Sequence, residues 1–265
     1  MGWWAYMRRR NWARGTRLKR LSEASLYVRR VPSWREATWR DVERYVDGRD
    51  VAPSSQRDIV SNLRAFYRWA GREGYCEQDP TALVDTPKVA RRLPRPARPD
   101  DIGQALELAP ARVAAMIALM AGCGLRCCEV AALRWDDVDL ASGEARVIGK
   151  GSKERPVWLS VEVVRRLALL DTVTPGPVFL NLHGRPASAA VVSQTVNSLF
   201  RALGLGARAH RLRHWHATDA LARSGNLAKV RDMLGHASAA TTEGYAALVP
   251  GEAAALQRAT KLPAA

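Results

Sequence analysis

The chain has 265 residues, enough for one or two domains with a sizeable core. Its formal net charge of +15 and pI of about 10.5 indicate a polyanionic partner such as nucleic acid, with a merely basic or ribosome-associated protein as the alternative. The N-terminus lacks the apolar core of a secretory signal, no apolar run is long enough for a bilayer, and the four cysteines lack zinc-ligand spacing, so the sequence argues against a secreted, membrane or metal-binding protein.

The first part of the chain predicts a bundle of about four short helices. Periodicity and cap residues place these helices at Trp3–Arg10, Arg17–Arg29, Trp39–Val46 and 54–74. Thr38 can cap the third helix, and Ser54 or Ser55 can cap the fourth. One face of the fourth helix carries Ile59, Leu63, Phe66 and Ala70. We expect the tryptophans of this part to lie in its core rather than to stack on bases.

A proline-rich segment divides the chain. Residues 88–101 contain Pro94, Pro96 and Pro99 among arginines, a composition that predicts a linker without helix. We therefore expect a helical domain at 1–90, a linker at 91–100 and a second domain at 101–265. Residues 1–96 hold 21 Lys/Arg and 11 Asp/Glu, so most of the net charge is expected in the first domain.

The second part of the chain predicts a mixed α/β domain. Two alternating segments, Glu144–Ile148 and Glu154–Leu159, flank Gly149-Lys150-Gly151-Ser152 and predict a β-hairpin. The remaining elements are expected to be helices at Arg112–Gly122, Arg126–Leu133, from about Val161, Ser188 and Leu212, at Asn226–Leu234 and at Gly251–Lys261. The predicted fold is mainly α with a small β-sheet. Cys127 and Cys128 are expected to be small buried residues of a helix.

Two arginines in the second part suit a reaction at a phosphodiester. Without a metal, the five-coordinate phosphoryl state needs fixed, always-protonated donors in a fork geometry, and Arg126 and Arg213 are the candidates. Arg126 follows a Gly-Cys-Gly turn that is expected to set it at a helix N-terminus. Glu129 lies one turn later, where it can pair with Arg126 and orient its guanidinium.

The remaining candidates supply a nucleophile and proton transfer. Tyr245 can attack phosphorus, but its hydroxyl has an ordinary pKa near 10 and needs help to lose its proton at neutral pH. His210 or His236 can accept that proton or hold the phosphate oxygens. Lys150, in the turn of the predicted hairpin, can protonate the leaving oxygen as a general acid.

Three strings resemble the tyrosine recombinases, the phage integrase and Xer-type family. They are GCGLRCCEVAALRWDDVDL, VIGKGSKERPVWL and HRLRHWHATDALARSGNLAKVRDMLGHASAATTEGY, in which Tyr245 lies nine residues after His236. The resemblance assigns the catalytic set to Arg126, Lys150 (rather than Lys153), His210, Arg213, His236 and Tyr245. It identifies the first domain as a core-binding domain and the second as the catalytic domain.

The resemblance implies a reaction and partners. Tyr245 would form a 3′-phosphotyrosyl link and free a 5′-hydroxyl, and a second strand would reverse this step through a Holliday junction, with no cofactor and no metal. The partners would be double-stranded DNA sites and three further copies of the chain in a homotetramer on two duplexes, with room for an accessory directionality factor. The implied location is cytoplasmic and nucleoid-associated, without a membrane partner.

Departures from the family pattern leave alternatives open. Trp215-His216 follows the HRLRH string where a hydroxyl residue and phenylalanine are commoner. An N-terminal arm-binding domain is not expected, which favours a compact phage or mobile-element recombinase over a chromosome-dimer resolvase. A type IB topoisomerase-like enzyme and a catalytically silent DNA-binding protein are the alternative functions.

Overall fold

The computed structural model describes residues 2–89, 93–149, 154–170 and 175–235, and the chain divides into two compact units, Met1–Arg91 and Arg92–Ala265. The predicted helix at 251–261 lies outside these ranges. Within the described ranges, no helix combines the length and apolarity that crossing a bilayer requires.

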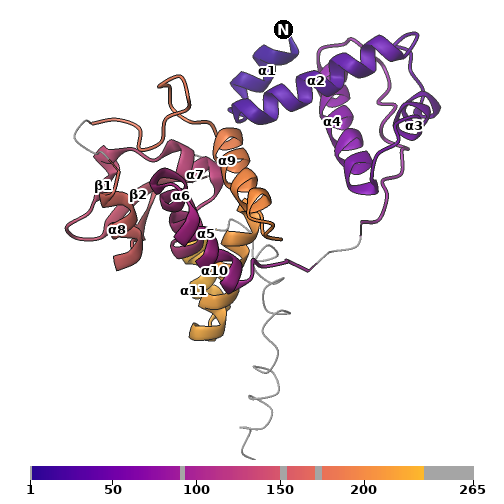
Figure 1. Cartoon of the computed structure of the whole chain (residues 1–265). Helices are drawn as coiled ribbons and strands as arrows, with labels where there is room; N and C mark the ends of the chain where they lie inside the picture. Colours follow the sequence, from indigo (N-terminus) through magenta and orange to yellow (C-terminus); the bar gives the residue numbers. More distant parts are fainter. Residues whose placement is uncertain (1, 90–92, 150–153, 171–174, 236–265) are drawn as a thin grey trace, which may run out of the picture. The chain divides into compact units, whose positions relative to one another are not determined.

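The described part of the first unit is a bundle of four helices (Figure 1). They are α1 (Trp3–Arg9), α2 (Arg14–Arg30), α3 (Trp39–Asp47) and α4 (Pro53–Arg72). All four were predicted within a few residues of these bounds. The predicted apolar face of α4 is buried as a whole, since Ile59, Leu63, Phe66 and Ala70 all lie in the core.

The two predicted caps of this bundle had different outcomes. Thr38 caps α3 in a capping box: its backbone amide and its hydroxyl both donate to Asp41 Oδ2, at 2.9 and 2.7 Å. For α4 the prediction of Ser54 or Ser55 was wrong, because the helix begins one residue earlier with Pro53 in its first turn. Proline suits that position, where its missing amide would have no intrahelical partner and its φ is already helical.

Aromatic side chains make up much of the core of the first unit. Trp3 and Trp69 are buried, with ring centroids 5.4 Å apart, and Phe66 packs edge-on against Trp3. Further tryptophans are partly buried against this cluster: Trp4, Trp12, Trp34 and Trp39. The tryptophans therefore serve the core, as predicted, and the Arg20 guanidinium lies 4.0 Å from the ring centroid of Trp12.

The second unit packs its helices around α6. Its described helices are α5 (Pro99–Leu108), α6 (Ala111–Gly122), α7 (Cys127–Ala132), a short 3-10 turn η1 (Trp135–Asp137), α8 (Val161–Ala168), α9 (Ala189–Ala202), α10 (Ala209–Ser224) and α11 (Leu227–Leu234). All residues of α6 from Val113 to Ala121 are buried, and α6 contacts α5, α7, α8, α9 and α10. It runs through the middle of the unit (Figure 1), which explains its nearly uninterrupted apolar sequence.

The expectation that residues 88–101 hold no helix was wrong at its end. Helix α5 starts at Pro99, with Asp100 and Asp101 in its first turn, where carboxylates favour the helix dipole. Ala97 is already buried, and its backbone amide donates to the carbonyl of Arg211, 3.0 Å away on α10. The prolines therefore end the connecting segment and begin the packed unit.

A small antiparallel sheet completes the second unit, in the order β1–β2–β3. Strands β2 (Glu144–Ile148) and β3 (Glu154–Trp158) form the predicted hairpin, and β1 (Val138–Asp139), which was not predicted, pairs with β2. In the hairpin register Val147 lies opposite Arg155, on the face that turns inward. The prediction of a mainly α fold with a small sheet is confirmed.

Candidate active site

Arg126 lies at the N-terminus of α7, as predicted from the glycine-containing turn before it. It is the N-cap residue of that helix, and Gly124, two residues earlier, has a φ of +64°. A Cβ atom on Gly124 would lie 2.6 Å from His216 Cδ2 and 2.8 Å from Leu234 Cδ2. Only glycine fits this turn, because it needs both left-handed backbone and the absence of a side chain.

Glu129 is the centre of a buried charge cluster. Only 2% of the surface of Glu129 is exposed. Its carboxylate accepts from the backbone amide of Arg126 at 2.8 Å and from Arg126 Nη1 at 3.0 Å. Arg155 donates to both carboxylate oxygens, at 2.9 and 3.2 Å, and Arg213 Nη1 lies 3.8 Å from Oε2. The predicted pairing of Glu129 with Arg126 is confirmed, and two further arginines share the same carboxylate.

The surrounding cations keep this carboxylate ionised. Burial alone acts to raise the pKa of Glu129, but the hydrogen bonds from Arg155 and from the Arg126 amide, together with the positive charges of both residues, outweigh it. The pKa of Glu129 is therefore held below its ordinary value. One negative charge faces three guanidinium groups, so the cluster keeps a positive excess that suits an anionic phosphoryl group.

Arg213 joins three separate segments from its place on α10. It is 7% exposed, and its Nη1 donates to the carbonyl of Gly124. Its Nη2 donates to the carbonyl of Leu234, the last residue of α11, at 2.8 Å. Arg213 thus holds the turn before Arg126 against the end of α11.

The first turns of α10 also carry histidines. The helix starts at Ala209 rather than near Leu212 as predicted, so His210 lies on the same helix, three residues before Arg213. Burial, followed by the charges of Arg211 and Arg208, lowers the pKa of His210 below its ordinary value. Burial lowers the pKa of His214 to about 4, with further contributions from His210 and Arg213. The neutral form of both rings is therefore favoured at neutral pH, and a neutral imidazole has one ring nitrogen that can accept a hydrogen bond.

The structure thus brings Arg126, Glu129 and Arg213 together and sets His210 one turn from Arg213 on the same helix. The three other predicted site residues, Lys150, His236 and Tyr245, lie outside the described residues.

Comparison with known proteins gives the family. The model of the phage integrase family matches residues 97–251, more than half of the chain. A tyrosine recombinase XerC of Lactobacillus delbrueckii is 32% identical over 234 residues, which cover 81% of this chain and 79% of the relative. The chain belongs to the phage integrase family of tyrosine recombinases. A XerC of a Methylobacterium species is 38% identical over 240 residues, covering 81% of the recombinase described here and 74% of that relative.

Solved structures agree on the fold. A lambda integrase dimer bound to a COC′ core site, residues 75–356, superposes with a TM-score of 0.75 at 19% identity, covering 92% of each chain. A XerH recombinase bound to its difH substrate gives a TM-score of 0.66 at 20% identity, covering 88% of this recombinase and 76% of that chain.

Arg155 is the residue of this cluster that was not predicted from the sequence. A signal was present, because β3 alternates and Arg155 shares its inward face with the buried Val157. An arginine on the inward face of a strand needs a buried acceptor. Among the described residues of the second unit, Glu129 has the most deeply buried carboxylate.

The cysteines of α7 depart from expectation. Cys127 is only partly buried and Cys128 is exposed, so the prediction that both are buried was wrong. Both precede Glu129 in the first turn of a six-residue helix whose inward side is taken by Glu129, Val130 and Ala131. In the described part of the recombinase, no group of three or more His, Cys, Asp or Glu side chains is arranged to hold a metal ion.

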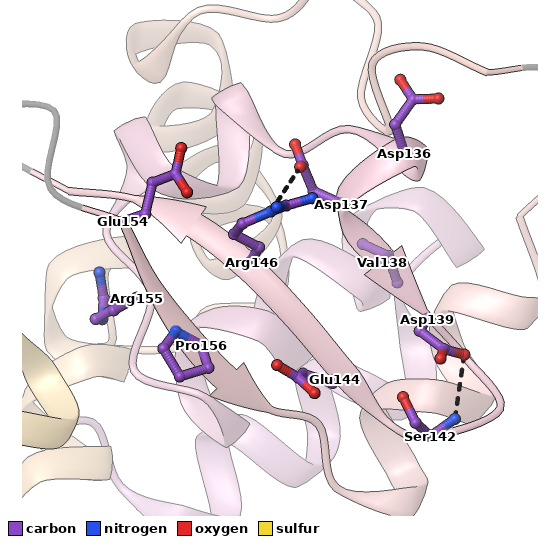
Figure 2. A pocket seen from close by; sticks show the side chains of 10 residues that line it. All are labelled: Asp136, Asp137, Val138, Asp139, Ser142, Glu144, Arg146, Glu154, Arg155 and Pro156. Carbon is purple, nitrogen blue, oxygen red and sulfur yellow. Dashed lines mark hydrogen bonds and ion pairs between the residues drawn. The ribbon is translucent and has the colours of Figure 1, made fainter.

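A hollow of about 460 Å³ opens on the sheet, and its charge is unsuited to DNA (Figure 2). Five acidic residues and two arginines line it, and one of the arginines, Arg146, pairs with Asp137 at 3.3 Å. The acidic residues are Asp136, Asp137, Asp139, Glu144 and Glu154. Phosphate is therefore expected at the arginines around Glu129 and not in this hollow.

Proposed function

We propose that this recombinase cuts and rejoins strands of double-stranded DNA at specific sites through a covalent link between Tyr245 and the 3′ phosphate. The observation that carries the proposal is the buried Glu129 carboxylate, which aligns Arg126 beside Arg213 in a chain that belongs to the tyrosine recombinase family. Two fixed guanidinium groups side by side match the non-bridging oxygens of a phosphodiester, which gain charge as a nucleophile attacks.

The proposed step balances without a cofactor. The Tyr245 oxygen attacks phosphorus and gives up its proton to His210 or His236, while the bond from phosphorus to the 5′ oxygen breaks. Lys150 protonates that leaving oxygen. The products are a 3′-phosphotyrosine and a free 5′-hydroxyl, and one phosphoester has replaced another. A 5′-hydroxyl from a second duplex reverses the step, so no energy source is needed.

Exchange between two duplexes needs several copies of the chain. One related structure is a lambda integrase tetramer bound to a Holliday junction, with a TM-score of 0.70 at 19% identity. We extend this arrangement to the present recombinase: four copies on two duplexes, each copy supplying one Tyr245, with an accessory protein able to set direction. The net charge of +15 offsets the repulsion that such a quantity of DNA creates.

Covalent capture tests this function. Randomly nicked genomic DNA of the source organism is incubated with the recombinase, and protein–DNA adducts that survive detergent are sequenced. A nick just 3′ of the cut lets the short fragment that carries the freed 5′-hydroxyl diffuse away, so the adduct accumulates. We expect adducts at a small set of related sequences, and none with Tyr245→Phe, which should retain its affinity for the same fragments because it lacks only the hydroxyl.

Each alternative function predicts a different outcome. Adducts scattered without a common sequence would indicate a topoisomerase-like enzyme. Specific binding without any adduct from the unaltered chain would indicate a DNA-binding protein without catalysis. Adducts of undiminished yield with Tyr245→Phe would show that another residue is the nucleophile.

A further inference from the structure

Arg155 is the strongest partner of the carboxylate that aligns the site, although it is not one of the residues to which the proposed function assigns chemistry. Its two terminal nitrogens donate in parallel to both oxygens of Glu129, at 2.9 and 3.2 Å. Such a bidentate pair fixes both the distance and the plane of the carboxylate. Arg126 reaches the same carboxylate with a single guanidinium nitrogen.

The geometry argues against Arg155 as a direct phosphate ligand. Its side chain is 14% exposed, compared with 33% for that of Arg126. Both terminal nitrogens are directed at Glu129, and little of the side chain is open to an incoming phosphate. Arg155 is therefore placed to act on the reaction through Glu129.

Arg155 also joins elements that are distant in sequence. It comes from β3, and its bonds to Glu129 reach α7, 26 residues away. Its side chain packs against Gly235, the C-cap of α11: a Cβ there would lie 3.2 Å from Arg155 Cδ and 3.3 Å from Nε. Arg155 thus links the hairpin, the helix entered at Arg126, and the end of α11 that Arg213 also holds.

We propose that Arg155 is a positioning residue for DNA cleavage, which fixes the Glu129 carboxylate so that Arg126 and Arg213 meet the scissile phosphate in register. This inference rests on the proposed function and adds a residue to it. Without the fork of Arg155, the carboxylate can rotate, and the guanidinium groups that depend on it lose their alignment with the phosphate.

Arg155→Lys separates positioning from charge. Lysine keeps the positive charge but offers one ammonium in place of a planar fork, so it cannot form two parallel bonds. The probe is a nicked duplex carrying a sequence recovered by covalent capture with the unaltered recombinase. At saturating protein we expect adduct formation to slow by about tenfold or more, the size of effect that small misplacements of reacting groups produce. DNA affinity should change by less than about twofold, because no phosphate contact is removed.

Arg165→Lys is the matched control. Arg165 forms a comparable bidentate pair with Glu162 on α8, at 2.9 and 2.9 Å, but this pair is exposed and belongs to neither α7 nor α10. The substitution Arg165→Lys should leave the rate of adduct formation unchanged. An unaltered rate in Arg155→Lys, or a loss of affinity equal to its loss of rate, would overturn the inference.

The double variant tests whether Arg155 acts through Glu129. Glu129→Gln alone should slow cleavage, and adding Arg155→Gln should slow it by no more than about twofold further, because residues that act as one unit are not additive. The double variant removes both members of the bidentate pair together, so neither is left in the interior without the other, and it remains usable if Arg155→Lys unfolds. Losses that multiply in full would contradict the inference.

The pH profile gives a readout that a purely structural role would not change. Arg155 is the largest contributor among the groups that lower the pKa of Glu129. In Arg155→Lys that pKa should rise, so cleavage should fall away at a higher pH on acidification than it does in the unaltered recombinase. An unchanged acid limb would count against positioning through Glu129. If the unaltered recombinase forms no adduct on the duplex, the proposed function itself fails, whatever Arg155 does.

Discussion

Arg126 and Arg213 share a carboxylate but differ in their other contacts. Two guanidinium nitrogens of Arg213 donate to the carbonyls of Gly124 and Leu234, so its side chain is held in place before any substrate binds. The side chain of Arg126 keeps a third of its surface exposed. We therefore expect Arg126 to make the first contact with an incoming phosphate and Arg213 to hold the geometry that receives it.

The role of Lys150 can be tested through the leaving group. If Lys150 protonates the departing 5′ oxygen, Lys150→Ala should slow cleavage by about a hundredfold or more. A substrate with sulfur in place of the bridging 5′ oxygen should restore much of this rate, because a thiolate departs without a proton. Single-turnover adduct formation on the two substrates measures the rescue.

Two further variants give the contrast. The sulfur substrate should not rescue Arg126→Ala, which loses stabilisation of charge on the non-bridging oxygens. Lys153→Ala should cleave faster than Lys150→Ala on the ordinary substrate. Equal rescue of Lys150→Ala and Arg126→Ala, or a larger defect in Lys153→Ala, would overturn the assignment of Lys150.

Gly124 gives a prediction for stability. In Gly124→Ala the new methyl would meet the His216 ring at 2.6 Å and Leu234 at 2.8 Å, on a backbone with a φ of +64°. Left-handed strain and forced repacking together should lower the free energy of unfolding by about 2–4 kcal/mol. Gly204→Ala is the control, because its φ is +69° but no atom lies within 4 Å of its Cβ position. Denaturant unfolding should show a clearly smaller loss for Gly204→Ala; equal losses would show that strain alone matters.

At the scale of elements, α9 determines where α10 begins. Arg208, the N-cap of α10, offers no side-chain cap. Instead the backbone amide of Ala209 donates to Asn197 Oδ1, 2.9 Å away on α9. This bond satisfies an amide of the first turn that the helix cannot satisfy, so α10 starts early enough to include His210.

Asn197→Ala should loosen the first turn of α10. We expect a loss of about 1 kcal/mol in the free energy of unfolding, the usual value of a helix cap. Cleavage should decline more than DNA affinity, because His210 lies in that turn. Ser198→Ala is the control, an exposed neighbour on the same helix. Cleavage by Asn197→Ala at the rate of Ser198→Ala would show that the bond from α9 does not position His210.

At the scale of the whole molecule, charge governs the encounter with DNA. Residues 1–96 carry 21 Lys/Arg against 11 Asp/Glu. Within the first unit, burial and then the nearby charge of Arg68 lower the pKa of Arg20, a sign that α2 and α4 hold two cations close together. The repulsion between these two cations falls when an anion binds beside them.

Binding should therefore weaken steeply with salt. Each neutralised phosphate adds about −0.9 to the slope of log affinity against log salt concentration, so six to ten contacts predict a slope of about −5 to −9. Arg68→Gln should make this slope shallower by about one, whereas Arg165→Gln, whose charge is paired with Glu162, should leave it unchanged. Fluorescence anisotropy at several salt concentrations measures the slope for the unaltered recombinase and for both variants. A slope near zero for the unaltered recombinase would contradict binding through phosphates.

The sequence by itself determined the elements that depend on near neighbours. The hairpin strands, the cap of α3 by Thr38 and the buried face of α4 follow from alternation, a cap residue and a helical period, all readable within a few residues. The pairing of Arg126 with Glu129 was predictable for the same reason, since one helical turn separates them.

Tertiary structure decided what depends on contacts between distant segments. The start of α10 is set by Asn197, twelve residues before Ala209, and the proline-rich segment before α5 is held to α10 by the bond from the Ala97 amide to the Arg211 carbonyl. The partnership of Arg155 with Glu129 joins a strand to a helix 26 residues away. A buried carboxylate must find donors wherever packing brings them, and local sequence does not encode which donors those are.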